Sequence, residues 1–264
     1  MLELLEYPMV MSGLVGLAMA ACALIGLDVS RRRATDEATR DYRGLFVGST
    51  LGLMSLVIGF TLSMSVARYD IRKAYEAQEA NAIGTEYNRI DLLTGADQPK
   101  IRALISNYLN ERIRFYVSRD EKDLRQNAVS TAQLQAEMWS AVRAAGTAQP
   151  NALVALAVSG MNEVLDDQGY AAAAWRNRLP VENYFLMAAL ALLANGLIGF
   201  GAPKTMPRTA VLTIMPAIIS VAFFLIVDID SPRGGFVHVE PHNLLELAES
   251  IRSPAGVQVL SGER

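Results

Sequence analysis

The sequence predicts an all-α, polytopic membrane protein with four transmembrane helices and a helical extramembrane domain between the second and the third. The first reason is composition, because 52% of the 264 residues are hydrophobic and only 19% are charged. An ordinary soluble domain carries about 25% charged residues. The second reason is that four uncharged runs are long enough to cross a bilayer. The third is the helical periodicity of the charged region between the second and third runs.

The four uncharged runs define the predicted spans. A bilayer core about 30 Å thick needs about 20 apolar residues in a helix. The runs cover about residues 9–27, 44–67, 184–202 and 209–227. A secretory signal peptide is the alternative for the first run, but Glu3 and Glu6 precede it where such signals carry basic residues. We therefore predict an N-terminal transmembrane hairpin over 1–67 and a C-terminal one over 184–227.

The region 68–183 is predicted to be a solvated helical domain. Between Arg68 and Pro180 there are 14 Lys and Arg against 14 Asp and Glu, so the region is neutral overall. Apolar residues recur at i, i+3, i+4 and i+7 from Ile101 to Tyr116, as in an amphipathic helix. The pattern returns around Met138, after a polar loop predicted near 119–130.

Two further predictions concern the ends of these regions. Small residues at Ala77, Ala80 and Gly84 share a face, so we expect the second span to continue as one long helix toward Tyr87. The last segment, 228–264, is predicted to be a C-terminal tail that begins with an Asp-x-Asp-x-Pro turn.

Composition and motifs also exclude several functions. The net charge of −3 provides no basic field for nucleic acid, and the single cysteine, Cys22, excludes an intrachain disulfide. No nucleophile elbow, phosphate loop or dinucleotide fingerprint occurs, so we expect no enzyme, no catalytic residue and no cofactor. The predicted spans contain no Asp, Glu, Lys, Arg or His, which disfavours proton pumps and voltage sensors. The predicted partner is the lipid bilayer.

A polar stripe on the second span is the main candidate for function. Thr61, Ser65, Arg68 and Arg72 are spaced by four, three and four residues, which places them on one helical face. If this face lines a pore, hydroxyl donors give way to guanidinium charge at the pore's end, which favours small anions. With the apolar side chains beside it, the path would be apolar at a constriction and basic at its exit. The pore-lining candidates are then Val57, Phe60, Thr61, Met64, Ser65 and Arg68. The alternative is that the hydroxyls bond to their own helix while the arginines anchor the span at the lipid headgroups.

Two glycine-containing motifs are interpreted structurally. Gly44, Gly48 and Gly52 stand four residues apart on the second span and favour close helix packing. After the fourth span, the motif of Asp228, Asp230, Pro232, Arg233 and Gly235 is predicted to form a turn in which Asp230 caps a helix or pairs with Arg233. Calcium binding by the two carboxylates is the alternative for this turn. Zinc binding by His238, Glu240 and His242 lacks a fourth ligand, and no metal is expected.

Several blocks of the sequence resemble one family, the bacterial bestrophin-like membrane proteins. This family is classed as a domain of unknown function and is distantly similar to the bestrophin anion channels. The resemblance rests on residues 59–64 and 68–72, then on 79–87, 91–93, 162–163 and 178–180, and finally on 228–235. Together the blocks extend over most of 44–247. The chain departs from bestrophins at Ile71, Arg72 and Lys73, where bestrophins tend to carry a pair of tryptophans.

The resemblance implies a homo-oligomer, a pentamer by analogy, in which the second spans form a narrow neck. It also implies that the middle domain and both termini lie in the cytoplasm, with the spans in the bacterial inner membrane. Charge does not decide the orientation, because seven Lys and Arg on one face oppose six on the other. Two functions stay open: a passive anion channel, or a non-conducting membrane protein whose helical domain binds a partner or senses the membrane.

Overall fold

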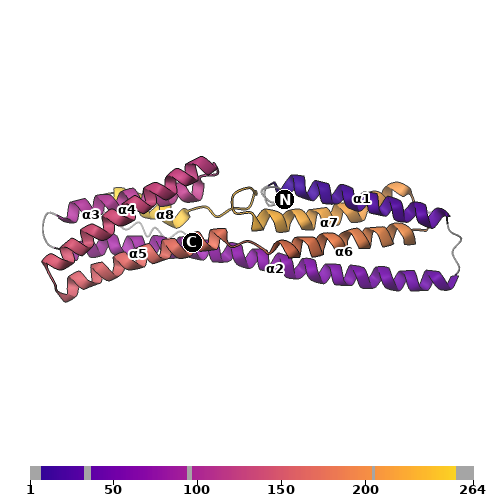
Figure 1. The fold of residues 1–264 in the computed structure, drawn as a ribbon, viewed down its shortest axis with the longest axis horizontal. Helices are drawn as coiled ribbons and strands as arrows, with labels where there is room; N and C mark the ends of the chain where they lie inside the picture. The colour runs from indigo at the N-terminus through magenta and orange to yellow at the C-terminus, as the bar shows by residue number, and fades with distance from the viewer. Residues whose placement is uncertain (1–6, 33–36, 94–96, 204–205, 254–264) are drawn as a thin grey trace, which may run out of the picture. The chain divides into compact units, whose positions relative to one another are not determined.

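The computed structural model describes residues 7–32, 37–93, 97–203 and 206–253, with the side chains of 37–41 and 43 left aside. These residues form helices and no strand (Figure 1). The elements are α1 (Pro8–Arg32), α2 (Glu37–Arg89), η2 (Ile90–Leu92), α3 (Asp97–Val117), α4 (Glu121–Ala148), α5 (Ala152–Arg176), α6 (Val181–Gly201), α7 (Arg208–Asp230) and α8 (His242–Arg252). The predicted all-helical class is thus confirmed, and so is the long second helix.

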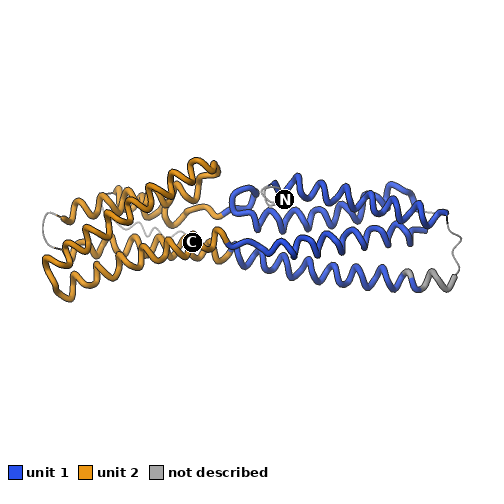
Figure 2. Tube along the Cα trace, in the orientation of Figure 1, with its two compact units in different colours: residues 1–69, 177–238 blue, residues 70–176, 239–264 orange. Residues whose placement is uncertain are grey.

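The chain divides into two compact units, coloured blue and orange in Figure 2. Unit 1 comprises Met1–Tyr69 and Asn177–His238, and it contains α1, the first part of α2, α6 and α7. Unit 2 comprises Asp70–Arg176 and Val239–Arg264, with the rest of α2, η2, α3, α4, α5 and α8. The predicted C-terminal tail is therefore shared, since its turn belongs to unit 1 and α8 to unit 2.

Four described helices are long and apolar enough to cross a membrane, and they contain the four predicted spans except Ala202 at the end of the third. Within unit 1, α1 and α6 come very close because glycines face backbone at their contact. A Cβ at Gly26 would overlap the backbone at Gly196, and a Cβ at Gly199 would overlap the backbone of Ala23. Small residues of this kind allow membrane helices to gain dispersion contacts along their backbones.

The core of unit 1 lies among the four spans. One cluster contains Met19 of α1, Met54 of α2, Ala191 and Ala194 of α6, and Ile219 of α7. A second cluster joins Tyr184 and Met187 of α6 to Phe223, Ile226 and Val227 of α7. Each cluster draws on α6 and α7, so one face of α2 packs on a hairpin far away in the sequence.

In unit 2, the prediction of a polar loop near 119–130 is wrong beyond Asp120, because α4 begins at Glu121. The Asp120 carboxylate caps the helix by accepting a hydrogen bond from the Lys122 backbone N–H at 3.4 Å. Glu121 and Asp123 lie in the first turn, where negative charge favours a helix. Polar residues therefore open this helix instead of forming a loop, and buried Asn127 bonds to α3 through the backbone oxygen of Glu111 at 2.7 Å.

Candidate functional site

The outward face of α2 is the main candidate surface in unit 1. In the membrane-spanning part of α2, large apolar side chains stay exposed in the single chain: Leu45, Phe46, Leu53, Leu56, Phe60 and Met64. The opposite side of the same helix is covered, with Met54, Thr61 and Ser65 buried. In a membrane protein, such an exposed face is covered by lipid or by another subunit.

The structure divides the predicted pore-lining stripe between these two faces. Phe60 is 65% exposed and Met64 is 42% exposed. Thr61 and Ser65 are buried, and their hydroxyls donate to the backbone oxygens of Val57 at 2.7 Å and of Thr61 at 3.1 Å. Val57 is half-buried against the cluster of α6 and α7. The two hydroxyls are therefore bonded to their own helix, as in the alternative interpretation, and only Phe60 and Met64 lie on the outward face.

The two arginines of the stripe have different surroundings. The half-buried Arg68 donates from Nη1 to the Asn177 side-chain oxygen within unit 1. Arg72 is 1% exposed and donates from Nε to the backbone oxygen of Ala174 at 3.3 Å within unit 2. The interpretation of Arg72 as a headgroup anchor is therefore wrong, because its guanidinium packs inside the protein.

Asp228 closes the turn that follows the fourth span. Its carboxylate accepts hydrogen bonds from the backbone N–H groups of Phe236 at 2.8 Å and Val237 at 2.9 Å. A Cβ at Gly235 would lie 2.5 Å from the Asp228 backbone oxygen, so only glycine fits this close approach. Asp228 therefore ties the end of α7 to the chain eight and nine residues later, with Pro232 buried and Arg233 half-buried in between.

Asp230 joins the end of α7 to the start of α6. Its carboxylate accepts the backbone N–H of Leu179 at 3.0 Å and the hydroxyl of Tyr184 at 2.9 Å, and it is 3% exposed. These contacts bring together residues 178–180 and 228–235, two of the blocks that carried the resemblance. They support the structural interpretation of the turn, with a partner that lies about fifty residues away in the sequence. Among the described residues, no group of three His, Cys, Asp or Glu is placed to hold a metal ion.

Unit 2 contains a buried ion pair that no motif in the sequence indicates. Glu79 of α2 pairs with Arg112 of α3, and both side chains are at most 1% exposed. The Tyr116 hydroxyl donates to Glu79 at 3.1 Å, and the Arg112 guanidinium lies 4.5 Å from the centre of the Phe115 ring. Burial, together with the Glu79 charge, raises the pKa of Tyr116. Burial opposes the charge of Arg112, but the charge and hydrogen bond of Glu79, together with Tyr108 and Tyr116, raise the pKa of Arg112.

A second buried carboxylate of α2 holds the C-terminal helix. Glu76 accepts the backbone N–H of Leu244 at 3.0 Å and the side-chain amide of Asn243 at 2.6 Å. Glu76 thereby satisfies donors at the N-terminus of α8, where a negative charge is favourable. One turn beyond Ala80, Gly84 lies against Leu247 of the same helix. At Gly84, the small-residue face predicted on α2 thus receives α8.

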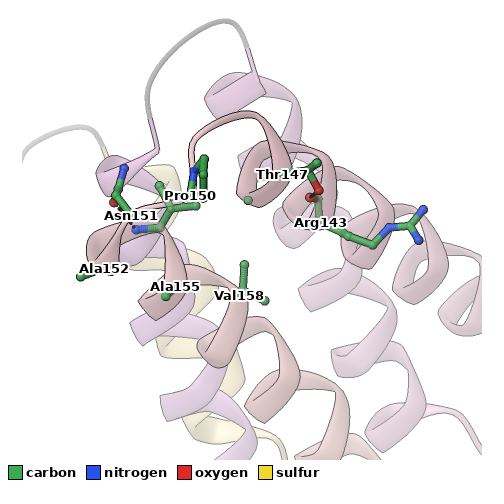
Figure 3. Close-up of a pocket in the computed structure, with 9 residues that line it drawn as sticks. Arg143, Thr147, Pro150, Asn151, Ala152, Ala155 and Val158 are labelled. Atoms are coloured by element: carbon green, nitrogen blue, oxygen red, sulfur yellow. Dashed lines mark hydrogen bonds between the residues drawn. The ribbon is translucent and has the colours of Figure 1, made fainter.

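A cavity of about 670 Å³ lies between the end of α4 and the start of α5 (Figure 3). Its lining is mostly apolar, and Arg143 is the only charged side chain among the described residues that form it. The Thr147 hydroxyl donates to the Arg143 backbone oxygen at 2.9 Å, and the Asn151 side chain accepts the Val154 N–H at 2.9 Å. Both polar groups therefore serve the adjoining helix ends.

The fold and these contacts define a polytopic helical membrane protein, and comparison with known proteins identifies its family. The model of the bestrophin-like domain matches residues 12–244, so the chain belongs to the bestrophin-like family. This confirms the resemblance, and none of the curated proteins compared matches the chain.

Crystal structures of a bacterial bestrophin homologue from Klebsiella pneumoniae share the fold. One variant has a TM-score of 0.65 at 12% identity, with 92% of this chain and 97% of that chain covered. A second variant has a TM-score of 0.64 at 12% identity, with 91% and 98% covered. Another structure of that homologue has a TM-score of 0.62 at 13% identity, with 91% and 98% covered.

Proposed function

We propose that this protein is a passive anion channel built from several copies of the chain, with the outward face of α2 around the conduction path. The observation that carries the proposal is the exposure of Phe60 and Met64 on a helix whose other face packs on α6 and α7. Membership of the bestrophin-like family supports it. By the same analogy, we place the spans in the bacterial inner membrane and the middle domain and termini in the cytoplasm.

Two different flanks of α2 support a ring in which each subunit contacts the next. In the described part of unit 1, nothing lies within 4 Å of a Cβ built at Gly48 or Gly52. At about 100° per residue, these glycines lie about 120° around the helix from the bulky flank of Leu53, Phe60 and Met64. The flank of Gly48 and Gly52 can then receive a different surface of the neighbouring subunit in a head-to-tail contact, while Phe60 and Met64 stay free to face the path. A closed ring of this kind, pentameric by analogy, would surround an axis.

Gly48→Leu should prevent this assembly. The new side chain would occupy the space into which a neighbouring helix is expected to pack, so we expect mainly monomer in mild detergent. Ala21→Leu, at an exposed position of α1, is the matched control and should leave the oligomer intact. Size-exclusion chromatography with light scattering measures both masses. An unchanged mass and thermal stability for Gly48→Leu would show that this flank faces lipid.

Chloride flux from proteoliposomes tests conduction directly. Wild type should release chloride faster than empty liposomes, and Phe60→Ala should increase the flux because it widens an apolar constriction. Phe185→Ala, which removes a similarly exposed ring from α6, should leave the flux unchanged. Arg68→Glu should lower the preference for anions, because it replaces positive with negative charge near the exit. An inert wild type, with Phe60→Ala merely less stable, would contradict the channel.

The alternative function is a non-conducting membrane protein whose helical domain binds a partner. The cavity between α4 and α5 is the observation that favours it, since its apolar lining offers area to a binding segment. The same flux assay separates the two functions. Flux that responds to Phe60 and not to Phe185 supports a channel, whereas inert liposomes favour partner binding.

A further inference from the structure

Glu86 of α2 is a buried acidic residue whose carboxyl has no hydrogen-bond partner in the part of the chain that the structure describes. Its side chain is 0% exposed, and neither carboxylate oxygen has a partner among the described residues. Opposite it on α5 lies Gly160, where a Cβ would overlap both the Glu86 carboxylate and the Arg89 guanidinium. Helix α5 therefore approaches Glu86 through a residue that has no side chain, and no space is left there for a larger one.

Two charged groups face the Glu86 carboxyl. Arg89 lies one turn further along α2, and Glu163 lies one turn further along α5. Arg89 Nη1 is 3.4 Å from Glu163 Oε2, so the guanidinium is already paired, with a carboxylate that is 57% exposed. The nearby charges of η2 and α3 are Asp91 and Arg102, which pair with each other.

Burial raises the pKa of Glu86 to about 8, and the Glu163 charge adds to this effect, while Arg89 opposes it. Near neutral pH the carboxyl is therefore mostly protonated and neutral. Burying a neutral carboxyl costs far less than burying an unpaired carboxylate. The buried position of Glu86 is thus compatible with its neutral form and is costly for its ionised form.

We propose that Glu86 is a proton-binding site at the contact between α2 and α5: the neutral carboxyl is held against Gly160, and the ionised carboxylate takes Arg89 from Glu163 and loosens the contact. This inference does not depend on ion conduction, since it concerns packing within unit 2. The ligand is a proton, and the carboxyl oxygen of Glu86 is the atom that accepts it.

The proposal fixes the sign of a pH effect on stability. The folded-state pKa of about 8 lies above the unfolded value of about 4.3. In this range the folded protein binds more protons than the unfolded chain, so its stability falls as the pH rises. The contribution of Glu86 to the stability of the fold should therefore be complete below about pH 4.3. It should decline between that pH and about pH 8, and the stability should not change further with this group above pH 8.

The test uses the full chain in detergent micelles, with the thermal midpoint measured between pH 6 and pH 9.5. Glu86→Gln keeps the size of the side chain and cannot ionise, so its midpoint should exceed that of wild type by a margin that grows up to about pH 8. Glu163→Gln removes a charge that raises the Glu86 pKa. The thermal midpoint of this variant should therefore decline at lower pH than the midpoint of wild type. Glu137→Gln, at an exposed position of α4, is the matched control and should follow wild type.

Hydrogen exchange, corrected for the intrinsic pH dependence of amide exchange, provides a local readout. Wild-type peptides around Glu86 and Gly160 should exchange faster above pH 8 than at pH 6, and those of Glu86→Gln should not. Equal pH profiles of the midpoint for wild type and Glu86→Gln would overturn the proposal. If Glu86→Gln does not fold, Glu163→Gln decides: a decline at lower pH than in wild type supports the proposal, and an unchanged decline overturns it.

Discussion

Arg112→Met should lower the free energy of unfolding by about 3–5 kcal/mol, because it leaves a buried carboxylate without its partner. Arg112 Nε pairs with Glu79, and a second contact from Nη2 to the other Glu79 oxygen measures 3.3 Å. In the variant, the Tyr116 hydroxyl would be the only donor to this carboxylate left among the described residues. The loss should therefore be among the largest that a single substitution outside the spans produces.

Denaturant or thermal unfolding of the purified protein measures this change. The double variant Arg112→Met with Glu79→Leu should recover most of the stability, since it removes both charges together. Arg125→Met is the control, because Arg125 pairs with Glu121 on the surface, at 66% and 80% side-chain exposure. That exposed pair should contribute less than about 1 kcal/mol. Equal losses for Arg112→Met and Arg125→Met would contradict the role given to the buried pair.

Asp230→Asn should lower the free energy of unfolding by about 1–3 kcal/mol. The substitution keeps the shape but replaces one acceptor oxygen by an NH₂ group. The backbone N–H of Leu179 and the hydroxyl of Tyr184 converge on the Asp230 carboxylate, so one of these donors would lose its acceptor. The link between the end of α7 and the start of α6 would weaken.

The thermal midpoint in detergent measures the effect, and Tyr184→Phe is the matched control. Tyr184→Phe removes one donor and keeps the ring, so its loss should be smaller than that of Asp230→Asn. Two results together would instead favour calcium binding by the turn. The thermal midpoint of Asp230→Asn would be unchanged, and an increase of the midpoint with calcium that wild type shows would disappear.

The spans and the helical class could be predicted from the sequence because lipid disfavours charged side chains at every position of a span. Residues 9–27 and 209–227 contain no charge, and each lies inside one described helix. The continuation of the second span as one long helix could also be predicted, from the helical spacing of the small residues after it. The start of α4 could not be predicted in this way, since the polar residues after Glu121 have the composition of a loop until Asn127 is seen to face α3.

The candidate surface was only partly predictable, because helical spacing groups residues without saying what each face meets. Phe60 and Thr61 are neighbours in the sequence, yet one is outward and the other is covered by the rest of unit 1. The contact of Gly199 with Ala23 was missed because it needs the pairing of α1 with α6. Gly48 has no close neighbour in the single chain, so its predicted contact stays a prediction.

The buried charges of α2 were the hardest to predict. Arg72, Glu76, Glu79 and Glu86 recur at helical spacing and are all buried on one face of α2. Charged side chains are usually solvated, so their spacing alone did not indicate a buried face. The spacing itself was visible, but burial depends on partners such as Arg112 on α3, and only the fold brings these together.

A structure of the purified oligomer in lipid nanodiscs tests the central claim most directly. The account predicts a closed ring in which the α2 helices surround the axis, with Phe60 and Met64 toward the path and the flank of Gly48 and Gly52 against the next subunit. A structure in which Phe60 and Met64 face lipid, and in which another helix or no helix surrounds the axis, would contradict it.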